Sequence, residues 1–318
     1  MVQEFRIGGT RAGGTAHAPT ILCAGIIVLD EVFQVEHFPQ PDVKAAAHGF
    51  FVVSGGCAAN AAVAVTRLGG RSVLAGPLGG PAGEDASGER ALALLARERV
   101  DCSGCLRVDG TSTPLSAIFV DARGDRMIVT RRDYRLDAAR PADPTGLVAS
   151  ADAVLADNRF PEFVRPICAA ARIRGLPVVL DADGPTPMDD ELFRIATHVV
   201  FSSDGLRATT GLDDLAAALV RIAAVTKSFL AVTRGPLDVL WWDGRALRNS
   251  EVFAVNAVDT LAAGDIFHGA FALALTEGEN EITAMRFAAA AAGLKCARIG
   301  GSAAAPRRPE VDALLAKG

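Results

Sequence analysis

The sequence has no excess of basic residues and no long uncharged hydrophobic run. Its 32 lysines and arginines are outnumbered by 37 aspartates and glutamates, and no basic stripe interrupts this balance, so no nucleic-acid partner is expected. The uncharged apolar runs are shorter than the roughly 18 residues that a membrane-spanning helix needs, so no membrane is expected as a partner either. The G-x-x-x-x-G-K-[ST] motif is also absent, which excludes a P-loop kinase.

Neither a secretory leader nor a cysteine-based zinc site is expected from the sequence. The first 20 residues are rich in Gly, Thr and Ala and contain no apolar core, which predicts a flexible tail over residues 1–19. Cys102 and Cys105 have the spacing of a zinc or redox pair, but no second Cys/His pair lies near them in the sequence, so their role stays open. These features predict a reduced protein of the cytoplasm.

Strand-like and helix-like segments alternate along the rest of the chain. This alternation predicts one α/β domain over residues 20–318, with a mostly parallel sheet and helices on both faces. Two regions, about 33–53 and 112–132, break the pattern and indicate a small β-lid that contains a hairpin. The strand patterns fall at 21–28, 71–76, 116–120, 126–130, 153–156, 177–181, 198–201 and 229–233, and the helix patterns at 58–68, 83–97, 162–174 and 212–226.

The most informative segment is Val258-Asp-Thr-Leu-Ala-Ala-Gly-Asp265. A strand pattern over 252–258 precedes it and a helix pattern follows it, so the small residues 262–264 would lie at a helix N-terminus. Free N–H groups and the helix dipole make such a position an anion site. Asp265 beside it could take a proton from a hydroxyl group, although the segment alone also fits an ordinary helix-capping aspartate.

This segment resembles the D-T-x-G-A-G-D signature of the ribokinase (phosphofructokinase B) family of sugar kinases, with Ala262 in place of the first family glycine. The resemblance extends from about Leu22 to Pro309. It implies a ribokinase-like three-layer sandwich with a small β-sheet lid, and transfer of the γ-phosphate of ATP to a sugar hydroxyl. It further implies that Asp265 is the catalytic base and that the amides of residues 262–265 form the anion hole.

Two N-terminal motifs also resemble the family. Asp30 follows the first strand pattern and matches the aspartate that binds sugar hydroxyls; the plain alternative is an aspartate that closes a turn. Gly55, Gly56 and Asn60 belong to Ser54-Gly-Gly-Cys-Ala-Ala-Asn60, which resembles the G-G-x-x-x-N stretch. Paired glycines allow close approach to a ligand, and an amide both donates and accepts, so the resemblance implies that these residues contact the sugar.

The resemblance implies that ATP lies along the C-terminal half. Thr233 and Gly235 resemble the T-x-G nucleotide turn, and Lys295 and Gly300 fall in regions that border the nucleoside in the family.

The metal ligands are less clear from the sequence. The magnesium-associated N-x-x-E motif reads Ser-Ser-Asp-Gly over 202–205, so both of its key residues are missing. Asp181 and Asp183 are candidates for water-mediated contacts to Mg²⁺, with solvated loop acids as the alternative. A monovalent cation such as K⁺ is a further cofactor that the resemblance allows.

Several details resemble bacterial sulfofructose kinases within this family. The arginine that matches Arg159 holds a sulfonate in those enzymes, and the planar guanidinium fork suits such an anion; a surface ion pair is the alternative. Asn60 and Thr130 depart from the pattern of those enzymes, which leaves ribose, fructose or another sugar open.

Two other functions stay open. An apolar lid at Phe50-Phe51 could stack a base, which would fit a nucleoside kinase of the same fold, and the altered N-x-x-E motif would fit a catalytically impaired sugar-binding protein. A homodimer through the lids, which would cover their open sheet edges, is a further expectation.

Overall fold

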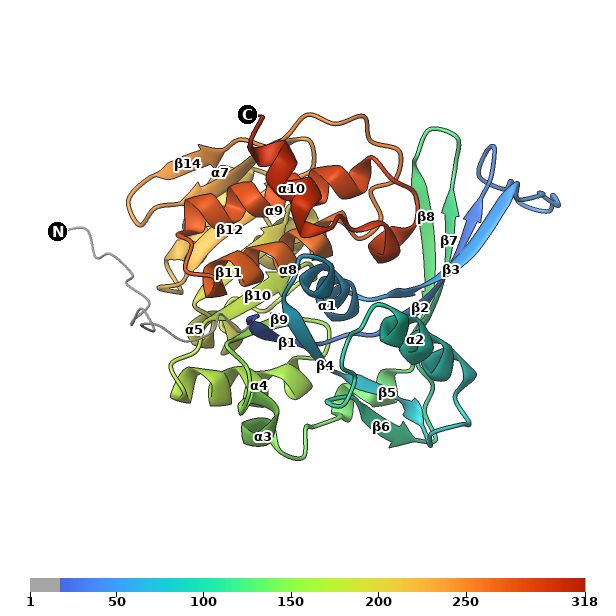
Figure 1. Ribbon diagram of the computed structural model, residues 1–318, viewed down its shortest axis with the longest axis horizontal. Helices are drawn as coiled ribbons and strands as arrows, with labels where there is room; N and C mark the ends of the chain where they lie inside the picture. Colours follow the sequence, from blue (N-terminus) through green and yellow to red (C-terminus); the bar gives the residue numbers. More distant parts are fainter. Residues whose placement is uncertain (1–17, 318) are drawn as a thin grey trace.

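A computed structural model describes residues 18–317 of the protein. The tail expected over residues 1–19 therefore lies outside the described residues, apart from its last two. Within the described range the chain forms a large sheet, a smaller four-stranded sheet and a pair of strands (Figure 1). None of the helices in this range is long and apolar enough to cross a membrane.

The large sheet has eight strands in the order β14-β13-β12-β11-β10-β9-β1-β4. The strands from β12 to β4 are parallel, and β13 and β14 extend the sheet in antiparallel fashion. Strands β1, β9 and β10 are buried at every residue, as expected for a parallel sheet that is covered on both faces. The strands are β1 (Thr20–Ala24), β4 (Arg71–Ala75), β9 (Ala153–Asp157), β10 (Val178–Ala182), β11 (His198–Ser202), β12 (Phe229–Arg234), β13 (Leu237–Trp242) and β14 (Leu247–Ser250).

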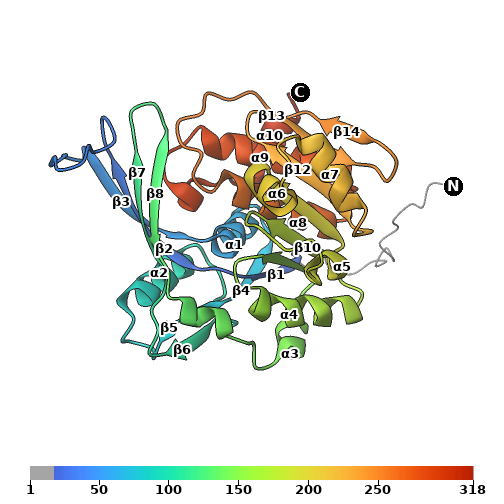
Figure 2. The same cartoon turned by 180° about the vertical axis from the view of Figure 1, so that it is seen from behind.

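Helices cover both faces of the large sheet and complete three layers (Figures 1 and 2). One face carries α1 (Cys57–Arg67), α8 (Ala263–Thr276), α9 (Glu281–Cys296) and α10 (Arg308–Leu315). The other carries α3 (Pro144–Val148), α4 (Pro161–Ile173), α5 (Leu192–Ile195), α6 (Ser203–Thr210) and α7 (Leu215–Ala223). Each face buries its own hydrophobic core, one around Phe271 of α8 and the other around Phe163 of α4.

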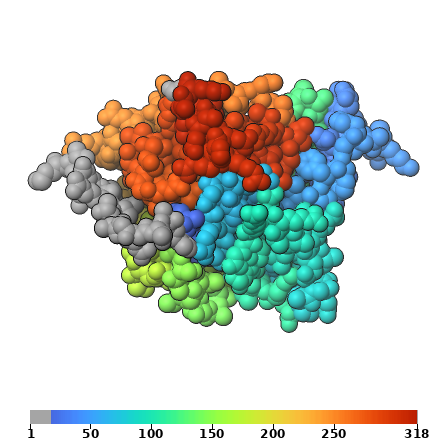
Figure 3. Space-filling model, viewed as in Figure 1, coloured from blue at the N-terminus to red at the C-terminus, as the bar shows by residue number. Residues whose placement is uncertain are grey.

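The second sheet has the strand order β3-β2-β7-β8 and stands at one side of the large sheet. Its strands are β2 (Val28–Gln34), β3 (Gly49–Gly55), β7 (Leu115–Val120) and β8 (Arg126–Arg131), and helix α2 (Ala86–Arg97) packs against β2 and β3. The connection from β2 to β3 projects from the body of the molecule as a blue arm (Figure 3). Strands β5 (Pro77–Gly80) and β6 (Leu106–Asp109) form the small pair, and two 3-10 helices span Tyr134–Ala138 and Gly301–Ala304.

The three-layer α/β class is confirmed, and most predicted elements are present within a few residues of their expected bounds. The strand predicted over 252–258 is wrong. That segment lies beside α9, where the Val258 N–H group donates to the Cys296 carbonyl, and it pairs with no strand among the described residues. The predicted first strand, 21–28, in fact comprises most of β1, a short link and the first residue of β2.

Candidate active site

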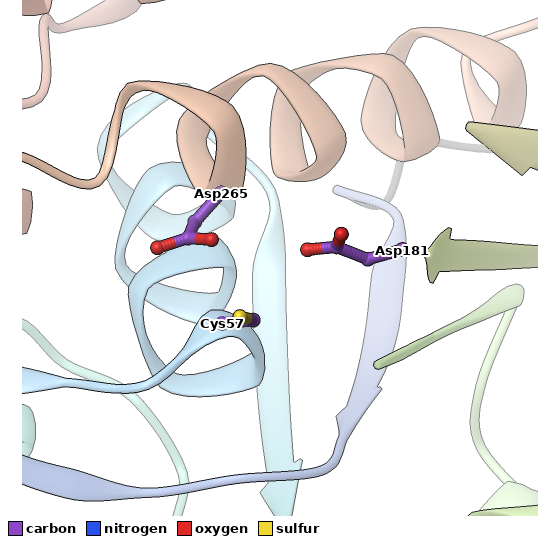
Figure 4. Close-up of side chains that lie close together, drawn as sticks. All are labelled: Cys57, Asp181 and Asp265. Carbon is purple, nitrogen blue, oxygen red and sulfur yellow. The ribbon is translucent and has the colours of Figure 1, made fainter. Parts of the chain in front are cut away.

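Acidic side chains from distant elements converge near the N-termini of α1 and α8. Asp265 comes from the first turn of α8, Asp181 from the carboxyl end of β10 and Cys57 from the start of α1. The two carboxylates and the thiol point toward one another, and one ligand atom from each lies within 4.8 Å of the others (Figure 4). This position outside the carboxyl ends of parallel strands is where open α/β sheets bind ligands.

The turn before α8 leaves backbone donors free. Ala262 adopts a left-handed conformation with φ of 66°, which bends the chain into the helix. The N–H group of Ala263 donates to the Thr260 carbonyl at 3.3 Å, whereas those of Gly264 and Asp265 have no acceptor among the described residues. A methyl group built on Gly264 would meet no atom within 4 Å, so the space in front of the turn is open.

The Asp259 carboxylate holds this turn from behind. Its Oδ1 atom accepts from the Leu261 N–H group at 2.8 Å, and its Oδ2 atom accepts from Gly300 at 3.0 Å and Gly301 at 3.3 Å. Lys295 approaches the same Oδ2 atom with its ammonium nitrogen at 2.9 Å. The turn is therefore joined to the end of α9 and to the Gly300–Gly301 loop.

Asn60 links α1 to the turn. Its Nδ2 atom donates to Asp265 Oδ2 at 2.7 Å, and its Oδ1 atom is buried without a partner among the described residues. A buried polar atom without a partner is rare, so an unpaired acceptor beside these acidic side chains indicates a ligand that carries hydroxyl groups. Burial raises the pKa of Asp265; the Asn60 hydrogen bond opposes the shift and the Asp183 charge adds to it.

Asp30 is on β2, so it brings a carboxylate from the small sheet to the same site. Burial raises its pKa to about 7; the Ser116 hydroxyl favours the charged form, and the charge of Asp265 disfavours it. Gly55 on the neighbouring strand leaves room for this side chain, because a Cβ there would lie 1.9 Å from Asp30 Oδ2. Gly56 has φ of 93° and starts α1. These glycines thus make room for the protein's own Asp30 and for the turn into α1.

Asp181 has an acceptor to spare. Its Oδ1 atom is buried and has no partner among the described residues, while its Oδ2 atom lies 3.4 Å from His268 Nδ1. Burial and the neighbouring carboxylates, first Asp265, raise the pKa of Asp181 well above its ordinary range. His268 contacts the Gly264 carbonyl at 2.7 Å and the Val200 carbonyl at 3.1 Å, so it joins α8 to the sheet.

The altered N-x-x-E motif forms the N-terminus of α6. Ser202 caps this helix by accepting from the Gly205 N–H group at 2.9 Å. A Cβ at Gly205 would lie 2.2 Å from the Ala182 carbonyl oxygen, so a glutamate at this position would collide with β10. Asp204 points outward, with 96% of its side chain exposed. No carboxylate from this stretch reaches the cluster.

Asp157, which the sequence suggests only as part of a polar rim before Arg159, also belongs to this site. Its Oδ2 atom accepts from the N–H groups of Ile26 (2.8 Å) and Ala58 (3.1 Å), and its Oδ1 atom accepts from Arg159 (3.0 Å). It therefore joins the link after β1, the start of α1 and the residues after β9. Burial raises its pKa to about 6. Its place at the carboxyl end of a buried strand is the signal that could have identified it.

Arg159 lies beside this cluster and is already paired. Its guanidinium contacts the Asp183 carboxylate, and about one third of each side chain is exposed (36% and 38%). Asn158 fixes the facing loop by donating to the Gly184 carbonyl at 2.6 Å. The guanidinium can therefore reach a ligand at the rim only alongside Asp183.

The expected nucleotide residues are spread over β12 and the end of α9. The Thr233 hydroxyl donates to the Phe201 carbonyl at 3.3 Å, and Gly235 makes the turn to β13 with φ of 60°. The Gly300 N–H group is engaged by Asp259. Lys295 is fully buried, so its ammonium is directed to Asp259 and away from any surface that a nucleotide could touch.

The comparisons with known proteins agree with this architecture. The family model for pfkB family carbohydrate kinases matches residues 18–308. The ribokinase of Bacillus subtilis is 28% identical over 298 residues, which cover 93% of this chain and 99% of that protein.

Two solved structures extend the likeness. A crystal structure of an Agrobacterium tumefaciens protein, provisionally assigned as a ribokinase, is 38% identical, covers 95% of this chain and 98% of its own, and has a TM-score of 0.89. A fructokinase of Xylella fastidiosa with bound ATP is 25% identical over 94% of this chain and 98% of its own, with a TM-score of 0.74. The family model and these likenesses cover nearly the whole described chain, and the protein is a member of the pfkB family of carbohydrate kinases.

Proposed function

We propose that the protein transfers the γ-phosphate of ATP to a hydroxyl group of a sugar, with Asp265 as the general base. The observation that carries the proposal is the contact between Asn60 and Asp265 beside the free N–H groups of Gly264 and Asp265. A proton acceptor next to an open anion site is what phosphoryl transfer to an alcohol requires. ATP as the donor is supported by the bound ATP of the related fructokinase.

In this mechanism Asp265 accepts the hydroxyl proton as the oxygen attacks the phosphoryl group. The raised pKa of Asp265 strengthens it as a base, because a carboxylate closer to neutrality binds the proton more firmly. The N–H groups of Gly264 and Asp265, together with the dipole of α8, stabilise the negative charge of the transferred group. Ala262 and Ala263 shape the turn that presents these donors.

The sugar is proposed to lie between Asp30 and Asn60. The Oδ1 atom of Asn60 accepts one hydroxyl, and the Asp30 carboxylate accepts two. Both groups are nearly inaccessible to solvent, 6% for Asp30 and 4% for Asn60, so a ligand that pairs with them gains strong hydrogen bonds. Gly55 supports this arrangement indirectly, because it leaves room for the Asp30 side chain.

Asp181 is the residue proposed to hold Mg²⁺. Its unpaired Oδ1 atom is a hard oxygen ligand, and Mg²⁺ needs few protein ligands because it keeps several waters. Asp183 is tied to Arg159 and is proposed to act through water, whereas burial and nearby carboxylates raise the pKa of Cys57 and keep it a neutral thiol. A bound Mg²⁺ would neutralise charge on the transferred phosphoryl group.

The nucleotide is proposed to approach along β12 and the loop that contains Gly300. The turn at Gly235 and the backbone at Thr233 lie at the carboxyl end of the sheet. We assign Lys295 a supporting position behind the turn, because its ammonium is buried.

A substrate panel tests the proposal. Ribose, fructose, sulfofructose and adenosine are each supplied with ATP and Mg²⁺, and ADP and the phosphorylated product are measured. Turnover with a sugar supports the proposal. Preference for adenosine would indicate a nucleoside kinase, and binding of sugar without turnover would indicate a sugar-binding protein.

A sugar with an anionic tail is a second candidate substrate. The observation that favours it is Arg159, whose guanidinium lies at the rim of the acidic cluster next to Asp157 and Asp183. A sulfonate could take the place of Asp183 as the partner of the planar fork.

A homodimer through the small sheet is also proposed. Strand β8 is exposed along its whole length, and its Ile128 and Val129 are 49% and 61% exposed. An edge strand with apolar side chains is a template for pairing. Sedimentation of the protein and of a variant with Ile128→Lys and Val129→Lys tests this proposal.

A further inference from the structure

Lys295 is one of the largest fully buried side chains of the described chain. It comes from the last turn of α9, and none of its surface is exposed. Its Nζ atom donates to the Asp259 carbonyl at 2.6 Å and lies 2.9 Å from Asp259 Oδ2. A buried ammonium is costly unless it is paired and hydrogen-bonded. The carbonyl oxygen and the Oδ2 atom of Asp259 are therefore both needed to stabilise the buried ammonium of Lys295.

This pair lies directly behind the proposed anion hole. Asp259 also accepts from Leu261, Gly300 and Gly301, so one carboxylate collects three N–H groups and one positive charge. The geometry of the turn that follows, with the left-handed Ala262, depends on Leu261 being held in this way. The charge of Lys295 therefore balances the anion that fixes the turn.

The residues behind the turn do not fit a bound monovalent cation such as K⁺. A cation there would need oxygen ligands, and it would compete with Lys295 for the carbonyl and the carboxylate of Asp259. Both are in contact with the ammonium of Lys295. An ammonium ion has one positive charge and satisfies the same oxygens, so it fills the role that a monovalent metal ion would have.

We infer that Lys295 is a built-in monovalent cation: it positions the turn from Asp259 to Asp265 and makes the protein independent of K⁺. The inference concerns a positioning residue and, for its effect on turnover, rests on the proposed kinase function. Its effect on the stability of the turn does not depend on that function.

The first experiment uses the wild-type protein. Turnover of the best sugar and the melting temperature are measured in KCl, NaCl and choline chloride at equal ionic strength. We expect kcat and Tm to agree between the three salts. Activation by KCl together with a rise of Tm in KCl over choline chloride would overturn the inference. If no sugar is turned over, the proposed function fails, and the salt dependence of Tm still tests Lys295.

The second experiment removes the charge. Lys295→Ala should lower kcat at least about tenfold and Tm by about 5–15 °C, because a buried carboxylate loses its partner. Ethylammonium, methylammonium or K⁺ should restore part of both quantities, and choline, which is too large, should not. The matched control is Lys227→Ala, because Lys227 is an exposed lysine in the loop that follows α7. This substitution should leave kcat and Tm unchanged.

A neutral side chain of similar length keeps the second experiment decisive. Lys295→Met fills the space without the charge, so it should also lose kcat and gain nothing from ethylammonium. Wild-type kcat and Tm in Lys295→Met would overturn the inference, because the charge would then be dispensable.

Discussion

The amide of Asn60 donates a 2.7 Å hydrogen bond to the carboxylate of Asp265, across a separation of 205 residues in the sequence. The Oδ1 atom of the same side chain is buried without a partner among the described residues. One side chain thus orients the proposed base and offers an acceptor to the ligand. The proposed roles of Asp265 and Asn60 depend on this junction between α1 and α8.

Replacement of Asp265 by asparagine should lower kcat by roughly 10²–10⁴-fold, the range for loss of a general base. The amide preserves the size of the side chain and the turn, but it cannot take the hydroxyl proton. Steady-state kinetics give kcat, and calorimetry with a non-hydrolysable ATP analogue should give an unchanged affinity. Near wild-type kcat in a folded Asp265→Asn protein would remove this residue from the mechanism.

Replacement of Asn60 by alanine should raise the sugar KM more than the ATP KM. The lost hydrogen bond to the sugar costs about 1.5–3 kcal/mol, and kcat should also fall because Asp265 loses its orienting donor. Asp30→Ala should raise the sugar KM by a similar factor with a smaller loss of kcat. Equal losses of ATP and sugar affinity in both variants would place these residues on the wrong side of the cleft.

The raised pKa of Asp30 predicts a pH dependence of stability. Its folded pKa of about 7 lies above the ordinary value, so the folded free protein holds one more proton than the unfolded chain between about pH 4 and 7. The stabilisation that Asp30 contributes is therefore present at low pH and is lost as the pH rises through 7. This loss lowers the free energy of unfolding by about 2–4 kcal/mol.

Asp30→Asn should therefore remove this loss. Melting temperatures measured between about pH 5 and 8 should fall less in the variant than in wild type, and the variant should be the more stable protein at about pH 8. The same slope in both proteins would assign the pH dependence to other groups. A sugar concentration near the wild-type KM should raise Tm more in wild type than in Asp30→Asn.

Asp157→Asn should weaken the frame of the site. Both carboxylate oxygens accept backbone N–H groups, so an amide must turn its NH₂ group toward one of these donors. The mismatch should cost about 1–3 kcal/mol in the free energy of unfolding, measured by denaturant titration. Because Ile26 and Ala58 adjoin the sugar side, sugar KM should rise as well. Asp152→Ala, which removes the acceptor of the Thr20 N–H group at the far end of the sheet, is the control for stability without an effect on KM.

Arg159→Lys tests the anionic-sugar candidate. A point charge cannot replace the planar fork, so activity on sulfofructose should fall strongly while activity on fructose should change little. Specificity is a difference between two transition-state affinities, and only the sulfonate substrate uses the fork. If the wild type prefers fructose, or if both substrates suffer equally, Arg159 serves the loop around Asp183 instead.

The sequence predicted the fold well where the pattern was repeated and local. The buried parallel strands read as short apolar runs, and their helices as amphipathic segments, because each pattern follows from local burial. The strand prediction over 252–258 was wrong because it also relied on local burial. The apolar residues of this segment pack beside α9, and burial alone does not distinguish a strand from an extended segment that lies on a helix. The D-T-x-x-x-G-D signature located Asp265 and its turn, which the structure places at the start of α8.

The rest of the site depends on contacts between distant residues. The role of Asp157 became clear only when β1, α1 and β9 were brought together. Lys295, which the resemblance placed near the nucleoside, is paired with Asp259, and the sequence gives no local sign of this pair. Asp183 likewise changed meaning once Arg159 was seen to pair with it. Pairing of charges across the fold is a property of three-dimensional packing that no local pattern encodes.

The chain leaves the large sheet at Ala24 and enters the small sheet at Val28. The small sheet carries Asp30, the proposed sugar-binding residue, whereas helix α8 on the large sheet carries Asp265, the proposed base. Asp30 and Asp265 are near enough for their charges to interact. A sugar is large enough to contact Asp30 and Asp265 at the same time, whereas a water molecule beside Asp265 makes no hydrogen bond to Asp30. Water should therefore compete poorly with the sugar as the acceptor of the phosphoryl group, and ATP hydrolysis in the absence of sugar should be slow.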